Sequence, residues 1–125
     1  MAHWTARYLG ISHEDLDCGQ LVELVLREQF GRDVSFPRKT DDDLAHRSAL
    51  IVSHAAEFAT PIDVPIDGCG VLMWSRGRRA HIGLYVIVDG IPYILHSDQP
   101  TGGSVLSPLH RLPAWYRIEG YYAWL

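Results

Sequence analysis

Apolar residues recur at helical spacing near the start of the chain. After Leu16, leucines and valines occupy positions 21, 22, 24, 25 and 26, and Phe30 follows one turn later. Gly31 comes next, and glycine is a common residue just beyond the end of a helix. The pattern predicts one amphipathic helix over residues 18–30.

The spacing of apolar residues is less regular in the next forty residues. Residues 36–43 contain Pro37 and three consecutive aspartates, which is typical of a loop whose Asp42 or Asp43 could cap a following helix. Leu44, Leu50 and later apolar residues then indicate a second helix over residues 44–58.

After Pro65 the chain becomes rich in β-branched and aromatic residues. The runs 71–74, 81–88 and 92–97 are separated by glycine-containing turns and predict three strands of an antiparallel sheet, in this order. Asp89-Gly90 favours a two-residue hairpin between the second and third strands. A final strand over 116–124 is expected at the sheet edge, after a connection bounded by prolines. The predicted fold class is therefore α+β, with helices first and the sheet second.

The size and charge of the chain limit its class. A length of 125 residues, 47% hydrophobic and 21% charged, predicts a single domain over 1–125. The formal net charge of −4 argues against a nucleic-acid partner, because phosphate binding needs a surplus of basic side chains. No apolar run is long enough for a membrane span, and the start of the chain lacks the pattern of a secretory signal. We therefore expect synthesis in the cytoplasm.

The two cysteines, Cys18 and Cys69, are expected to be free thiols in a reducing compartment. The seven histidines show no His-x-x-x-His spacing and the cysteines no Cys-x-x-Cys spacing, so we predict no metal and no cofactor.

Cys18 opens the first predicted helix, where the helix dipole favours a thiolate. A cysteine nucleophile needs a base, and His81 opens a predicted strand expected to lie against that end of the helix. With a turn at Asp89-Gly90, residues whose numbers sum to 179 face each other. His81 would then lie opposite Asp98 and beside His96, which could orient its ring. Taken singly, Cys18 is as well explained as a packing residue, and each histidine is better explained as a satisfied surface or core residue.

Three segments together resemble one family. Residues 17–22 (DCGQLV), 81–86 (HIGLYV) and 95–96 (LH) are similar to the NlpC/P60 cysteine peptidases, which carry Asp-Cys-Ser/Trp-Gly-Leu-Val, His-Val-Gly-Ile-Tyr and a third polar residue. The likeness covers most of the chain. Trp4, Tyr8 and Gly10 before the cysteine, and residues 120–122 (GYY) near the end, resemble the branch of phage and prophage proteins associated with tail assembly.

The resemblance implies a papain-like fold with Cys18 as nucleophile, His81 as base and His96 as the group that orients the base. It also implies that Tyr8 helps to form the oxyanion site, although Tyr8 could equally pack against the first helix. The implied activity is hydrolysis of peptidoglycan stem peptides after D-γ-glutamate. Such an enzyme would reach the wall by lysis, in a virion or through an injection machine.

The sequence also departs from the family. Gly19-Gln20 follows the cysteine where the family has Ser-Gly or Trp-Gly, and Cys69 replaces an acidic residue at the first core strand, where we interpret it as structural. The alternative hypothesis is therefore a structural component of a phage tail or secretion assembly that keeps the fold without the activity. A third hypothesis is acyl transfer, or cleavage of another amide, at the same site.

Overall fold

The computed structural model describes residues 3–36, 56–98 and 100–125, with only the backbone at 78–80. The elements, in chain order, are η1 (Trp4–Tyr8), α1 (Cys18–Phe30), β1 (Ala59–Ile62), β2 (Gly70–Ser75), β3 (Arg78–Val88), β4 (Ile91–Asp98), β5 (Gly103–Pro108), η2 (Leu109–Arg111) and β6 (Tyr116–Trp124). Most of the helix predicted over 44–58, and most of the loop predicted over 36–43, lie outside the described residues, although residues 56–58 are helical.

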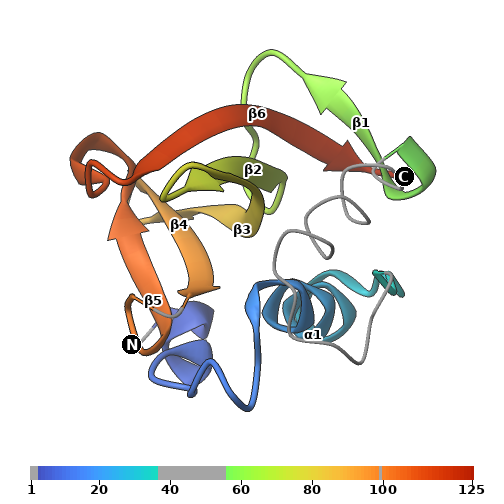
Figure 1. Ribbon diagram of the computed structural model, residues 1–125. Coiled ribbons are helices and arrows are strands. Elements are labelled where there is room, and N and C mark those ends of the chain that lie inside the picture. Colours follow the sequence, from blue (N-terminus) through green and yellow to red (C-terminus); the bar gives the residue numbers. More distant parts are fainter. Residues whose placement is uncertain (1–2, 37–55, 99) are drawn as a thin grey trace.

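One antiparallel sheet of six strands, in the order β1-β6-β2-β3-β4-β5, dominates the fold (Figure 1). The predicted α+β class is confirmed, as is the predicted succession of the strands at 71–74, 81–88 and 92–97.

The edge position predicted for residues 116–124 is wrong, because β6 lies between β1 and β2. The true edges are β1 and β5, which the sequence analysis missed. β1 contains Pro61 and β5 ends at Pro108, and proline is tolerated at edges because an edge strand leaves one row of amides unpaired.

The hairpin between β3 and β4 has the predicted register. Val88 pairs with Ile91, Tyr85 with Ile94 and Leu84 with Leu95, so the paired numbers sum to 179. Asp89 has a φ of 52° and Gly90 a φ of 79°, as a turn with two left-handed residues requires. The register therefore brings the ends of β3 and β4 together where the sequence analysis expected the candidate histidines.

Helix α1 begins and ends as predicted. The Asp17 side chain accepts a hydrogen bond from the Gln20 amide, the Gln20 side chain accepts one from the Asp17 amide, and Gly31 ends the helix in the left-handed conformation. The buried stripe of the helix packs against β3 and β4. Cys18 is thereby fixed in the first turn, next to a completed capping box.

The two faces of the sheet have different roles. Side chains that pack with α1, including Ile82, Leu84 and Leu95, define what we call the helix face. The alternating side chains, including Tyr85 and Ile94, form a second core and define the inner face.

The sheet curls toward its inner face. Tyr116 of β6 and Asp98 of β4 are three strand spacings apart, about 14 Å in a flat sheet, yet the Tyr116 hydroxyl lies 2.7 Å from Asp98 Oδ2. Only a strongly curved sheet allows these side chains to meet.

None of the helices among the residues described is long and apolar enough to cross a membrane.

Candidate active site

A pair of buried histidines lies at one end of the inner face. His81 comes from β3 and His96 from β4, and His81 Nε2 is 2.7 Å from His96 Nδ1. The exposed fraction is 6% for His81 and zero for His96. The predicted adjacency of the two histidines is therefore confirmed.

The second nitrogen of His96 also has a partner. His96 Nε2 lies 2.8 Å from Ser107 Oγ. Ser107 pairs with Ile94 across the ladder between β5 and β4, so its side chain points to the same face of the sheet as those of Ile94 and His96. Hydrogen bonds thus join three side chains in a line from β3 through β4 to β5.

An aromatic ring and a carboxylate border the histidines. The Tyr116 ring stacks on His81 with centroids 5.4 Å apart and meets His96 edge-on. The Tyr116 hydroxyl donates to Asp98 Oδ2 at 2.7 Å, and Ser75 Oγ donates to the same oxygen at 2.9 Å. Both contacts restrict the position of the carboxylate beside the histidine pair.

Burial keeps both imidazoles neutral. It lowers the pKa of His81 to about 4, against the opposing effect of the Asp98 charge. Burial, helped by the neighbouring His81, lowers the pKa of His96 to about 3. Near neutral pH each ring therefore carries one proton, and each has one nitrogen that donates and one that accepts.

The close approach of β3 to β4 depends on Gly83. A Cβ at this position would lie 2.7 Å from Ile94 Cγ2, 3.0 Å from the Leu95 oxygen and 3.1 Å from His96 Cβ. The glycine in the segment HIGLYV thus leaves the space that the His96 side chain and its strand occupy.

Two features concern the chain just before Cys18 and the strand of His81. The Leu16 carbonyl, two residues before Cys18, accepts a hydrogen bond of 2.8 Å from Ser97 Oγ, next to His96 in β4. The ladder between β2 and β3 contains a bulge. Met73 of β2 pairs with His81 of β3, but the next residue, Trp74, pairs with Arg79, so Ala80 is an extra residue in β3. Such a bulge redirects nearby side chains at the end of a sheet. The segment just before α1 is therefore tied to the end of β4, and a bulge in β3 directly precedes His81.

The position of Tyr8 corrects one prediction. Its buried hydroxyl donates to Glu28 at 2.8 Å and accepts from Gln29 at 2.9 Å, and its ring packs in the core under α1. Glu28 is ten residues beyond Cys18, about 15 Å along the helix axis. The oxyanion role of Tyr8 is wrong, and the alternative of packing against the first helix holds.

Sequence reasoning did not assign Ser107 or Tyr116 to the site. Ser107 belongs to β5, which has no alternating pattern that predicts a strand. Tyr116 starts a predicted strand, but its meeting with His81 depends on the curl of the sheet. Asp98 alone was foreseeable, because the register predicted from the Asp89-Gly90 turn sets it opposite His81.

The second cysteine lies in the core of the inner face. Cys69 is 1% exposed in the inner core, and burial raises the pKa of its thiol. Within the described part of the chain, no three potential ligand side chains converge as a metal site requires.

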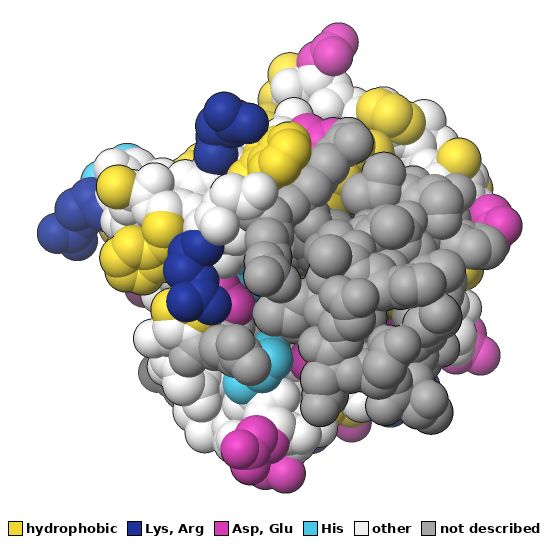
Figure 2. Space-filling model, in the orientation of Figure 1, with side chains coloured by type: hydrophobic (Ala, Val, Ile, Leu, Met, Phe, Trp, Pro, Cys, Tyr) yellow, Lys and Arg dark blue, Asp and Glu magenta, His cyan; other side chains and the backbone are white. Residues whose placement is uncertain are grey.

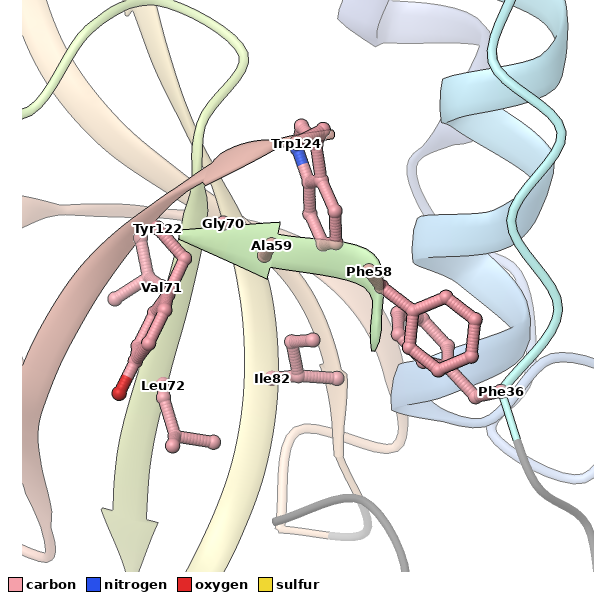
Figure 3. Close-up of a pocket in the computed structure, with 9 residues that line it drawn as sticks. All are labelled: Phe36, Phe58, Ala59, Gly70, Val71, Leu72, Ile82, Tyr122 and Trp124. Atoms are coloured by element: carbon pink, nitrogen blue, oxygen red, sulfur yellow. The ribbon is translucent and has the colours of Figure 1, made fainter. Parts of the chain in front are cut away.

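One further hollow lies on the helix face (Figure 3). Its walls are mainly apolar and include Phe36, Phe58, Leu72, Trp124 and Tyr122. On the side of the molecule shown in Figure 2, the visible arginines are interspersed with acidic and apolar side chains, and the described residues form no extended basic surface there.

Comparisons with models of protein families, with curated proteins and with solved structures found no match to this chain.

Proposed function

We propose that this protein is a cysteine hydrolase with a papain-like site, in which Cys18 is the nucleophile, His81 the base and His96 the residue that orients the base. The observation that carries the proposal is the buried hydrogen bond between His81 Nε2 and His96 Nδ1. Because Nε2 of His81 contacts the second histidine, the proposal gives the role of base to the other nitrogen, Nδ1.

The proposed reaction follows from these roles. His81 Nδ1 takes the proton of the Cys18 thiol while Sγ attacks the carbonyl carbon of an amide. First-turn amides at the start of α1 point along the helix axis and stabilise the tetrahedral oxyanion. His81 then donates its proton to the leaving amine, which leaves a thioester on Cys18. Water, deprotonated by His81, cleaves the thioester and restores the thiol.

The proposal requires the thiol to approach His81 at the end of the sheet. α1 lies on the helix face, whereas the histidine side chains belong to the inner face. The bulge at Ala80 and the hydrogen bond between Ser97 and Leu16 are both at this end. The proposal therefore has Cys18 reach Nδ1 of His81 past the bulged end of β3.

The substrate class comes from the resemblance to the NlpC/P60 peptidases. We propose cleavage of the amide bond after D-γ-glutamate in peptidoglycan stem peptides, by an enzyme of phage or prophage origin. It would be made in the cytoplasm and delivered to the cell wall by lysis, in a virion or by injection machinery.

Purified muropeptides incubated with the protein test the proposal. We expect the unmodified chain and Cys69→Ala to release the stem-peptide fragment, and Cys18→Ala to release none while keeping the same circular dichroism spectrum. Cys69→Ala is the matched control because it also removes a thiol, from a position that is buried in the inner core. Equal cleavage by Cys18→Ala, or no cleavage by the unmodified chain, would refute the proposed function.

A further inference from the structure

The Asp98 carboxylate belongs to the same face of the sheet as the histidine pair. The β3–β4 ladder pairs residues whose numbers sum to 179. The two strands stay close beyond the last of these pairs, because a Cβ on Gly83 would lie 3.1 Å from His96 Cβ. Continuation of the same register sets Asp98 opposite His81, and side chains directly opposite each other in a ladder share one face.

Two neighbouring strands hold this carboxylate in place. The Tyr116 ring of β6 stacks on His81, and the Tyr116 hydroxyl donates to Asp98 Oδ2 at 2.7 Å. Ser75 of β2 donates to the same oxygen at 2.9 Å. Tyr116 therefore joins the carboxylate to the ring of the proposed base, at the end of the sheet where His81 lies.

We propose that Asp98 is a positioning residue whose carboxylate acts through His81, as the counter-charge of the imidazolium that forms when His81 takes the Cys18 proton. The inference rests on the proposed function, because it takes His81 as the base. The proton moves from Sγ of Cys18 to Nδ1 of His81, which gives a thiolate and an imidazolium. Asp98 remains ionised throughout and receives no proton.

The other charges near His81 do not favour its protonated form. Burial lowers the pKa of His81, His13 acts in the same direction, and the Asp98 charge opposes both. Tyr116 stays neutral because burial and Asp98 raise the pKa of its hydroxyl. Arg76, in the turn between β2 and β3, is exposed, so solvent screens its charge. Among these groups, Asp98 supplies the charge that stabilises the imidazolium.

The expected size of the effect follows from general electrostatics. An opposite charge within about 4–6 Å shifts a pKa by about 1–3 units, and we take about 1 unit because two hydroxyls already bind the Asp98 carboxylate. One pKa unit of the base changes the population of the thiolate–imidazolium pair about 10-fold. Asp98→Asn should therefore slow the reaction of Cys18 with iodoacetamide at pH 7 about 5- to 10-fold. The amide oxygen of asparagine can still accept from Tyr116 and Ser75, so the variant removes the charge and keeps the shape.

The test measures this alkylation rate at pH 7 in a Cys69→Ser background, for Asp98→Asn alone and combined with His81→Ala. Without His81, Asp98→Asn should leave the rate unchanged or raise it, because removal of a nearby negative charge favours the thiolate. Asp67→Asn is the matched control and should leave the rate unchanged. It removes the same charge from a carboxylate that accepts from the Ile87 amide, near the other end of β3.

Two results would overturn the inference. One is a folded Asp98→Asn variant that reacts as fast as the unmodified chain, and the other is equal slowing by Asp98→Asn with and without His81. If Asp98→Asn does not fold, Asp98→Glu and Asp98→Gln give the same comparison of charge at equal length, and equal rates in that pair overturn the inference too. Slowing that depends on His81, without muropeptide cleavage by the unmodified chain, would refute the proposed substrate and leave the role of Asp98 standing.

Discussion

The two buried histidines should make the protein unstable in mild acid. An unfolded histidine has a pKa of about 6.5, whereas burial lowers the pKa of His81 to about 4 and that of His96 to about 3. Between these values the unfolded chain binds more protons than the folded chain, so stability is lost as the pH falls below about 6.5.

The size of the effect follows from the same values. At pH 5 the unfolded state gains about 2 kcal/mol from protonation of each histidine, and the folded state gains almost nothing. His81 and His96 together should therefore lower the free energy of unfolding by about 4 kcal/mol between pH 7.5 and pH 5. This is a large share of the stability of a small domain.

Urea unfolding followed by tryptophan fluorescence at pH 7.5, 6.5, 5.5 and 5.0 measures the effect. A His81→Gln/His96→Gln variant should lose most of the pH dependence, whatever its stability at pH 7.5. His110→Gln, at an exposed histidine in η2, should keep it. Equal stability of the unmodified chain at pH 7.5 and pH 5, or an undiminished slope in the double variant, would refute the reasoning.

Two further substitutions test the surroundings of the site. Tyr8→Phe removes the hydroxyl that is hydrogen-bonded to Glu28 and Gln29. It should lower the free energy of unfolding by about 1 kcal/mol in urea titrations without changing the rate of muropeptide cleavage. A large loss of kcat at unchanged stability would restore the oxyanion role. Gly83→Ala places a Cβ 3.0 Å from the Leu95 oxygen, and we expect at least about 2 kcal/mol of destabilisation by overpacking, whereas a neutral effect would contradict the close approach of the strands.

The sequence predicts the parts of the fold that local chemistry determines. Gly31 ends α1 as predicted, and Asp89-Gly90 sets the register of the β3–β4 hairpin. The position of β6 was not predictable in this way, because strand order depends on which edge remains open after the earlier strands pair. β5 was missed since a short edge strand with serines and a proline has no alternating apolar pattern.

The same distinction applies to the candidate site: some of its contacts follow from local sequence and others do not. The adjacency of His81 and His96 follows from register, which the sequence determines locally. The contacts of Tyr116 with His81 and of Ser107 with His96 depend on strands distant in sequence. Tyr8 was misassigned because its place in a motif does not determine where its hydroxyl points; the partners on α1 decide that.

The pairing of Cys18 with His81 is tested most directly by the rate at which Cys18 reacts with iodoacetamide at pH 7. The measurement uses a Cys69→Ser background, in which Cys18 is the sole thiol. If His81 accepts the thiol proton, His81→Ala should slow alkylation by at least about 10-fold, whereas His110→Gln should leave the rate unchanged. An alkylation rate that is the same with and without the His81 imidazole, in a folded variant, would show that the two residues do not form a catalytic pair.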